Sequence, residues 1–223
     1  AKSGKMTPAQ SHFAGPRRPI EELYDCENDP LNLKNLANSP KHQKILKRMR
    51  NEHLRYSLEI RDWGYIPEYE AWEMSKGSSG WKVGKSSKVA WEKIIDAAEL
   101  VGRAKESKFV TNLKSEDETI RYWATIGLGA YEKKLSNDSL SALEKALKDS
   151  SASVRIEAAN ALIQNGNTET AIAVLIEELE HKNLIVVTHA ARTIELLGDR
   201  AKKALPAMKA CLKRAYAVRP PDL

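Results

Sequence analysis

Apolar residues recur at nearly constant spacing between about residues 105 and 213. Three branched residues, Ile120, Val154 and Val186, serve as anchors, and they stand at nearly equal intervals along the chain. Each anchor has apolar residues eleven and seven positions before it and four and eight positions after it. Eleven positions before the anchors stand Phe109, Leu143 and Leu175, and seven positions before them stand Leu113, Leu147 and Leu179. Four positions after the anchors stand Ala124, Ala158 and Ala190, and eight positions after them stand Leu128, Leu162 and Ile194. Because intervals of three and four residues line one face of a helix, the pattern predicts helix-turn-helix units, each of which needs a neighbour to bury its apolar face.

The residues between the apolar positions indicate where these helices begin and end. Alanine four residues after each anchor allows neighbouring helices to approach closely. Gly166 and Gly198, which follow the second and third anchors, are expected to end their helices in the left-handed conformation, whereas Glu132 stands at that position in the first copy. The turns at 115–118 and 149–153 contain Asp and Ser side chains that can cap the next helix.

These turns and the residues after them resemble HEAT repeats. HEAT repeats place Asp or Ser in the turn inside each unit and a branched residue followed by Arg just after it, as Ile120-Arg121 and Val154-Arg155 do here. The third copy has Val187 where Arg is expected. The pattern therefore does not predict a continuous ladder of arginines along the stack.

A fourth copy starts with Leu205, Met208 and Leu212, and Pro206 suits the first turn of its helix. This copy is predicted to be a cap or a half-repeat. Residues 89–223 are therefore predicted to form an armadillo-like α-α superhelix of about three and a half HEAT-like repeats. The expected fold class is mainly α.

The N-terminal part of the chain, residues 1–75, follows a different pattern. Residues 1–19 are polar and interrupted by prolines, as expected of a loop or a short edge strand, and residues 19–25 alternate enough to predict a short strand. A helix is expected from Ser39, as its cap, and Pro40, in its first turn, to about residue 63. The predicted buried face of this helix consists of Ile45, Met49, Leu58, Trp63 and either Leu54 or His53.

Four short strings in this region resemble the C-terminal subdomain of bacterial type I sulfatases, the formylglycine-dependent enzymes that include N-sulfoglucosamine sulfohydrolase-like members. They are Glu-Leu-Tyr-Asp at 22–25, Asp-Pro at 29–30, Asn-Leu-Ala at 35–37 and Asp-Trp-Gly-Tyr-Ile-Pro-Glu at 62–68. Asn32 departs from the family, which usually has Glu there. The resemblance implies a small α+β sulfatase remnant over residues 1–75, joined by a linker at 76–88 to the helical extension at 89–223.

The catalytic motifs of that family do not occur in this sequence. A type I sulfatase makes its formylglycine from Cys or Ser in a Cys/Ser-x-Pro-Ser-Arg motif and holds calcium with several Asp and Asn residues. Cys26 is followed by Glu-Asn-Asp and Cys211 by Leu-Lys-Arg, and no acidic cluster matches the calcium site. We therefore expect no catalytic residue, metal site or cofactor in this chain, and calcium in a catalytic domain upstream of Ala1. The resemblance implies that the parent enzyme hydrolyses a sulfate ester or an N-sulfate, on a glycan, and is periplasmic or secreted.

Composition adds little to this picture. The 223 residues include 36 Lys and Arg and 30 Asp and Glu, for a net charge of +6, and the two signs are interspersed. Nucleic acid is therefore not an expected partner. The two cysteines lack the spacing of a zinc site, and no apolar run is long enough to cross a membrane.

Two groups of side chains are candidates for a binding surface, one on the basic helix and one in the aromatic stretch before the repeats. They are Lys44, Lys47, Arg48 and Arg55, and Trp72 and Trp81. Spaced cations could bind a sulfated glycan, and tryptophan could stack on a sugar ring. The structural alternatives are a solvated helix face and tryptophans that pack the linker onto the subdomain or onto the missing catalytic domain.

Two functions remain open at this point. The first is a non-catalytic accessory fragment of a sulfatase, whose repeats offer an interaction surface to the catalytic domain or to another protein. The second is a free-standing HEAT-repeat module that binds a protein or a polyanion.

Overall fold

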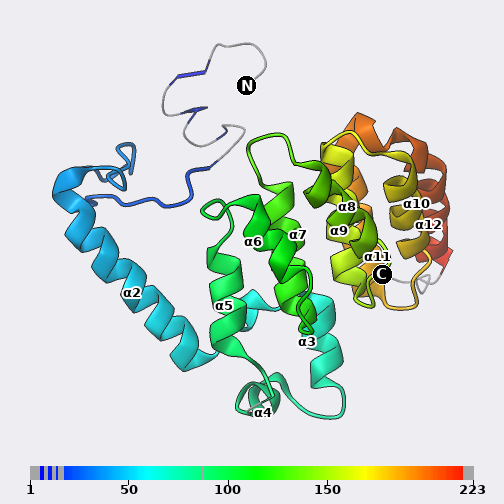
Figure 1. The fold of residues 1–223 in the computed structure, drawn as a ribbon, viewed down its shortest axis with the longest axis horizontal. Helices are drawn as coiled ribbons and strands as arrows, with labels where there is room; N and C mark the ends of the chain where they lie inside the picture. Colours follow the sequence, from blue (N-terminus) through cyan, green and yellow to red (C-terminus); the bar gives the residue numbers. More distant parts are fainter. Residues whose placement is uncertain (1–5, 8–9, 12–13, 15–17, 87, 218–223) are drawn as a thin grey trace. The chain divides into compact units, whose positions relative to one another are not determined.

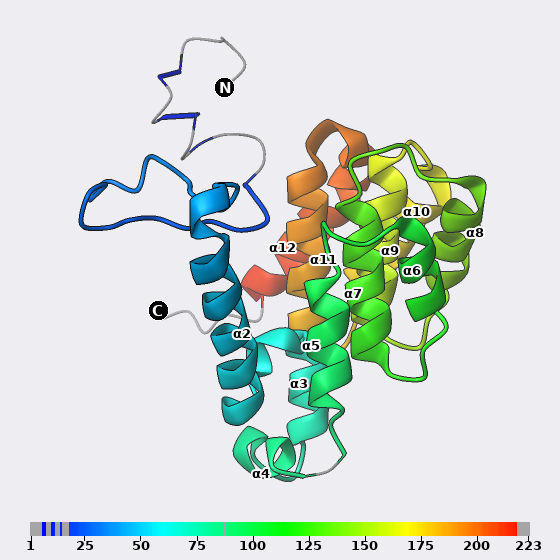
Figure 2. The same cartoon turned by 60° about the vertical axis from the view of Figure 1, so that its left-hand side comes forward.

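A computed structural model describes residues 6–7, 10–11, 14, 18–86 and 88–217. The chain forms two compact units, Ala1–Ile60 and Arg61–Leu223. Within the described ranges every regular element is helical, as Figures 1 and 2 show. None of these helices combines the length and the apolar character needed to span a membrane.

The Asn35 side chain joins two parts of the loop before the first long helix. Asn35 donates from Nδ2 to the carbonyl of Glu21 and accepts at Oδ1 from the N–H of Leu23. A backbone bond from the Leu36 N–H to the Leu23 carbonyl is the accompanying main-chain link. The strand predicted at 19–25 is wrong, and the described part of the chain shows no α+β subdomain, because side-chain hydrogen bonds stand in for a strand ladder.

Helix α2 (Gln43–Ile60) follows the 3-10 turn η1 (Pro40–His42). The proline lies in the first turn as predicted, but Ser39 makes no side-chain capping bond. The helix ends earlier than predicted because Arg61 adopts a left-handed conformation, with φ of +55°. A right-handed helix needs a negative φ, so the helix cannot continue through Arg61. A non-glycine side chain makes this conformation costly.

The buried face of α2 also differs from the predicted one. Leu46 packs with Leu23 and Ala37 in a small core. Ile45 and Met49, which the pattern places inside, are exposed. Leu54 and Leu58 of the predicted face are half-buried. The prediction is therefore wrong by about one residue in the first half of the helix, where consecutive positions differ by about 100° in direction, and holds in part in the second half.

The second unit begins with a short aromatic segment. Four helical elements lead into the stack: η2 (Trp63–Tyr65), α3 (Glu68–Ser75), α4 (Gly80–Gly84) and α5 (Trp91–Glu99). The rings of Trp63 and Trp91 meet edge to face with centroids 5.6 Å apart. The carbonyl of Gly84 accepts hydrogen bonds from Arg61 and from Trp91 Nε1. The stretch at 76–88, predicted as a linker, thus contains a helix tied to its neighbours.

Three helical hairpins follow, as predicted. They are α6 (Glu106–Asn112) with α7 (Glu118–Gly129), α8 (Asn137–Ala146) with α9 (Ala152–Gln164), and α10 (Glu169–Glu178) with α11 (Leu184–Leu197). The stack continues with η3 (Gly198–Ala204) and α12 (Leu205–Ala217), and Figure 1 shows the hairpins in chain order from green to red. All apolar positions of the second and third copies are buried in one core. The mainly helical repeat fold is therefore confirmed.

The helix ends match the predicted signals. Asp117 and Ser151 accept hydrogen bonds from N–H groups in the first turns of α7 and α9. Gly166 and Gly198 have φ of +92° and +55°, a region that glycine enters without steric cost. Asn183 caps α11 in the same way as Asp117 caps α7.

Gly127 and Gly129 of α7 offer a matched test of the packing in the first hairpin. A Cβ atom on Gly127 would lie 2.2 Å from the Phe109 ring, whereas one on Gly129 would meet the Ala161 Cβ at 3.5 Å. We expect Gly127→Ala to lower the free energy of unfolding by about 1–3 kcal/mol through overpacking. Gly129→Ala should raise it by up to about 1 kcal/mol through helix propensity. Urea unfolding followed by circular dichroism measures both, and equal effects would argue against this packing.

Candidate interaction surface of the helical stack

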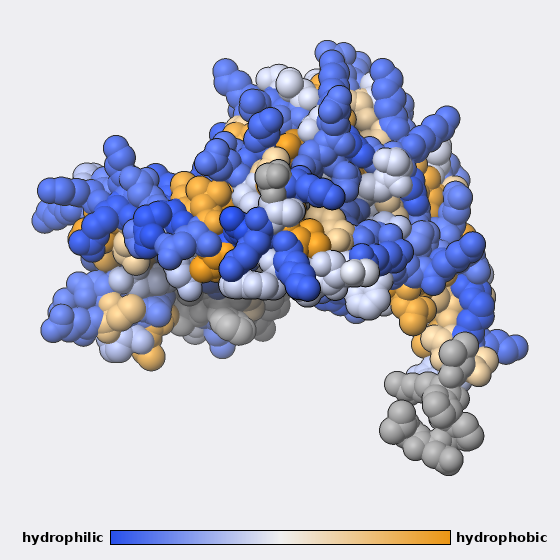
Figure 3. Space-filling view, turned by 90° about the horizontal axis from the view of Figure 1, so that it is seen from below, coloured by the Kyte–Doolittle hydropathy of each residue, from blue (hydrophilic) through white to orange (hydrophobic). Residues whose placement is uncertain are grey.

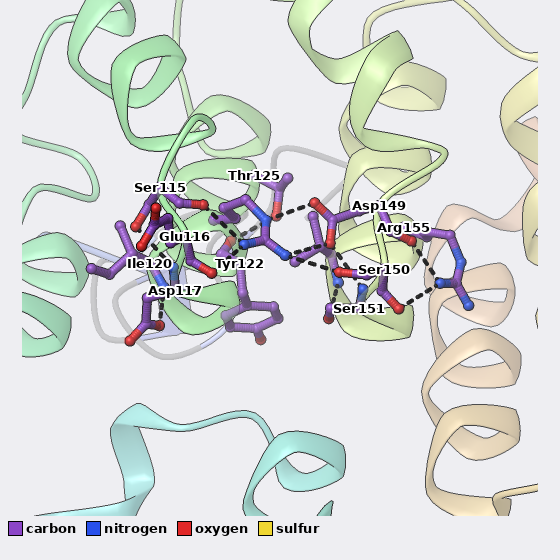
Figure 4. A network of polar contacts seen from close by, with 12 residues as sticks. Ser115, Glu116, Asp117, Ile120, Tyr122, Thr125, Asp149, Ser150, Ser151 and Arg155 are labelled. Carbon is purple, nitrogen blue, oxygen red and sulfur yellow. Dashed lines mark hydrogen bonds and ion pairs between the residues drawn. The ribbon is translucent and has the colours of Figure 1, made fainter. Parts of the chain in front are cut away.

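Arginines at the turns join consecutive hairpins, in a network that Figure 4 shows in part. Arg121, in the first turn of α7, donates from Nε and Nη2 to the two carboxylate oxygens of Asp149 at 2.7 and 2.8 Å. Its Nη1 donates to the carbonyls of Ser115 and Glu116. Because a guanidinium carries five donors in a fixed fork, one side chain both closes its own turn and binds the next one.

Arg155 repeats this arrangement one hairpin later. Its Nη1 donates to the carbonyls of Asp149 and Ser150, and its Nε donates to the Glu178 carboxylate at 2.5 Å. The third hairpin has Val187 at the equivalent position. We refer to the Arg121 and Arg155 contacts as the arginine ladder, which therefore joins the first hairpin to the second and the second to the third.

The carboxyl group of Asp149 is held in its charged form. Burial alone would raise the pKa of Asp149, but hydrogen bonds from Arg121 and from the Ser151 N–H, with the positive charges of Arg121 and Arg155, lower it below its usual value. The hydrogen bond to Asp149 in turn raises the pKa of Arg121. The arginine ladder therefore stabilises the fold wherever Asp149 is ionised.

The inner layer of the stack consists of the second helices α7, α9 and α11, which pack in that order. Figure 2 shows these helices from a second direction. Residues 62–75, which we call the docked segment, lie against this layer, since α3 contacts both α9 and α11. Trp123 Nε1 donates to the Tyr65 carbonyl at 2.8 Å, and the rings of Tyr69 and His181 meet edge to face with centroids 5.6 Å apart. The stack thus binds a segment of its own chain.

Glu70 makes the central polar contact of the docked segment. The residue is 4% exposed. Its Oε1 accepts from Ser151 Oγ at 2.5 Å, and its Oε2 accepts from Ser153 Oγ at 2.7 Å. Both serines lie at the start of α9, where the helix dipole also favours a negative charge. Since a buried carboxylate is costly unless it is hydrogen-bonded, these two hydroxyl groups favour an acidic side chain at this position.

A second polar pair lies on the inner layer. His189 Nε2 on α11 is 2.7 Å from Glu157 Oε1 on α9, and Asn160 Nδ2 donates to Glu157 Oε2. Burial raises the pKa of Tyr122, and the negative charges of Glu157 and Glu70 add to this effect. Over the described ranges, no group of three or more His, Cys, Asp or Glu is placed to hold a metal ion. The pair of His189 and Glu157 links α11 to α9 beside the docked segment.

The four cations predicted as a binding surface lie on α2, in the first unit. Lys44, Lys47 and Arg48 are exposed on its first half. Arg55, on its second half, pairs with Glu52 at 2.6 Å and with Glu59 at 2.5 Å. The structure thus groups three of the four cations and neutralises the other.

The two predicted tryptophans lie in the second unit. Trp72 on α3 and Trp81 on α4 are both exposed, and Lys85 Nζ lies 3.9 Å from the centre of the Trp81 ring. Figure 3 shows a face on which hydrophobic patches are separated by hydrophilic side chains. Single exposed aromatic residues are common on protein surfaces.

Sequence analysis missed the contacts of the docked segment. The density of aromatic residues before the repeats indicated that this stretch packs against something, but it did not identify the inner layer as its partner. A further signal was present in the second turn, where Ser151 and Ser153 supply two hydroxyl groups although one is enough for a cap. Glu70 is the acidic residue that uses both.

Asp149→Asn should lower the free energy of unfolding at neutral pH by about 3 kcal/mol, because Arg121 keeps its charge and loses its buried partner. Since the folded-state pKa of Asp149 is depressed, the advantage of the wild type is full above the unfolded-state value of about 4 and is lost as the pH falls through the folded-state pKa. Urea unfolding across an acidic-to-neutral pH series measures the difference. Asp96→Asn, on the exposed side of α5, is the control. A difference that did not change with pH would count against the arginine ladder.

Glu70→Ala should loosen the docked segment, because the hydroxyl groups of Ser151 and Ser153 lose their acceptor. We expect faster amide hydrogen exchange in α3 and a loss of about 2 kcal/mol in the free energy of unfolding. Glu73→Ala is the matched control, since Glu73 pairs on the surface with Lys76. Hydrogen exchange that responded equally to both substitutions would show that Glu70 does not hold the segment.

Comparison with known proteins agrees with this geometry. The family described as HEAT repeats matches residues 106–179 and 140–219, which together span just over half of the chain. An ulvan-active sulfatase of Formosa agariphila is 42% identical over 67 residues, which are 30% of this chain and 11% of that protein. No solved structure matches. The repeated hairpins, their capped turns and the family match agree, and this chain belongs to the HEAT-repeat family.

Proposed function

We propose that this chain is a non-catalytic accessory part of a longer sulfatase, in which the HEAT stack provides an interaction surface for the sulfatase fold. The observation that carries the proposal is the docked segment. Its first half is the 62–68 string that resembles sulfatases, and its second half is α3, whose Glu70 is buried against α9. The inner layer therefore binds a segment of its own chain whose sequence resembles that of sulfatases.

The position of this contact suggests a bracing role. Trp123, Ser151, Ser153 and His181 come from three successive parts of the stack, and all four contact the docked segment. A rigid array of helices that binds one strip of chain at several points restricts its motion, which is how repeat stacks commonly present extended binding surfaces. The proposed role is to keep this strip in place beside the rest of the sulfatase fold.

The chemistry of the parent enzyme is part of the proposal and rests on resemblance. Hydrolysis of a sulfate ester or an N-sulfate on a glycan would need a formylglycine and calcium in a catalytic domain. Cys26 and Cys211 lie outside any matching motif. The relative from Formosa agariphila is named for its action on ulvan, which supports a glycan substrate and a periplasmic or secreted protein.

A binding module for a polyanion is the second candidate, and α2 favours it. Lys44, Lys47 and Arg48 lie in its first half, where the first turn carries no acidic residue. Cations near a helix N-terminus oppose the helix dipole, so a bound anion such as a sulfated glycan would relieve that repulsion.

The proposal predicts where sulfatase activity resides. Activity is measured with a chromogenic aryl sulfate and with a sulfated glucosamine, on this chain and on the reading frame extended upstream. We expect activity in the longer protein alone, since the nucleophile and calcium motifs are expected there.

In that protein, Glu70→Ala should lower the temperature at which sulfatase activity is lost more than Glu73→Ala does, because the contact between the docked segment and the inner layer is weakened.

Absence of activity from both forms would overturn the sulfatase assignment. Salt-sensitive retention of this chain on immobilised ulvan, lost in a Lys44→Glu/Arg48→Glu double variant, would then favour the polyanion-binding module. Retention that was unchanged in that variant would reject α2 as the binding surface.

A further inference from the structure

The second helix of the middle hairpin ends at a chemically labile dipeptide. Asn165-Gly166 is the single Asn-Gly pair in the sequence. Asn165 is the C-terminal cap of α9, and Gly166 follows it with φ of +92°. At the equivalent place in the first and third copies, eleven residues after the anchor, the chain has Tyr131 and Leu197. Of the three copies, the second therefore carries a side-chain amide next to a glycine at this turn and the other two do not.

An Asn-Gly pair can rearrange without an enzyme. The backbone nitrogen of Gly166 gives up its proton and attacks Cγ of Asn165. A bond forms between these two atoms, the bond from Cγ to Nδ2 breaks, and Nδ2 takes up a proton and leaves as ammonia. Water then opens the five-membered imide at either carbonyl, which yields aspartate or isoaspartate. The net reaction consumes one water and releases one ammonia, and glycine favours it because no side chain hinders the attacking nitrogen.

Water can reach this turn. Gly166 is exposed, and no atom outside its immediate neighbours lies within 4 Å of the place where a Cβ would stand. A cavity of about 460 Å³ beside the turn is lined by Gly166, Asn167 and Leu162, among others. Burial therefore does not protect the pair, and any protection has to come from the way the turn holds its atoms.

The cap of α9 keeps the two reacting groups apart. Asn165 Nδ2 donates to the Ala161 carbonyl at 2.8 Å, so the side-chain amide points back along the helix. The Gly166 N–H donates to the Ile163 carbonyl at 3.2 Å, so the nitrogen that has to attack has its proton engaged in a hydrogen bond. Because the attack needs the two atoms in contact and aligned, the pair stays intact while the end of α9 is closed.

We propose that Asn165-Gly166 is a spontaneous modification site that the fold holds in check and that reacts when the end of α9 opens. The aspartate or isoaspartate product has no amide N–H to donate to the Ala161 carbonyl. Its negative charge lies at the C-terminal end of α9, where the helix dipole disfavours it. Each conversion thus weakens the junction between the second and third hairpins. The extent of conversion records how often that junction has opened.

The test compares the conversion of Asn165 in the folded whole chain and in the same chain unfolded by urea. Both are incubated at mildly alkaline pH in heavy-oxygen water, digested in ordinary water and analysed by mass spectrometry, so that the label marks conversion during the incubation. We expect conversion in the folded chain to be at least about tenfold slower, because the reaction follows the population of the opened turn. Asn165→Gln is the negative control, since its longer side chain would have to close a six-membered ring.

Two neighbouring variants test whether opening of the turn sets the rate. Ile163→Val removes a methyl group from a residue that is 1% exposed in the last turn of α9, and Gln164→Ala changes the exposed residue next to it. We expect Ile163→Val to speed conversion in the folded chain by about two- to tenfold and Gln164→Ala to leave it unchanged. Circular dichroism checks that both variants fold.

Equal rates in the folded and unfolded chain, no conversion in the unfolded chain, or equal effects of the two variants would overturn the proposal. The test does not depend on whether the longer protein is a sulfatase.

Discussion

A helical hairpin of this chain cannot bury its own apolar face, and that constraint governs the rest of the structure. Each pair of helices has one stripe for its partner and another for the next pair, so stability comes from neighbours in the stack. The turns add a directional contact to this packing. Arg121 binds its own turn and Asp149 of the next one, so the spacing between hairpins is set by a fork of hydrogen bonds as well as by apolar contact.

Because the helices of the stack need neighbours to cover them, a segment from outside the repeats can also pack against the stack. The inner layer leaves the first turn of α9 with two serine hydroxyl groups, and Glu70 from outside the repeats satisfies both. One acidic side chain therefore connects sequence that resembles a sulfatase with sequence that is repetitive. A region that composition alone would separate into two domains is joined by a contact between residues about eighty positions apart.

The parts predicted well from sequence are those with a repeated or local cause. The hairpins follow from apolar residues at regular offsets. Gly166 marks a helix end by its positive φ, and Asp117 marks a helix start by the capping hydrogen bonds that its side chain accepts. The errors lie where one residue pairs with a distant one. The strand expected before α2 was replaced by the side-chain bonds of Asn35, whose partners are set by tertiary structure. Asn32, where sulfatases usually have Glu, adopts φ of +53°, a conformation that Asn tolerates better than Glu.

The ion pairs between successive hairpins become more exposed along the chain. Arg121 and Asp149 are both nearly buried, Arg155 is partly exposed beside the buried Glu178, and Arg214 and Glu180 are both open to solvent. Salt screens exposed pairs far more than buried ones. Rising ionic strength therefore weakens the junctions in a fixed order, starting at α12. The junction between the first two hairpins, where Arg121 and Asp149 are nearly buried, is the one that salt affects least.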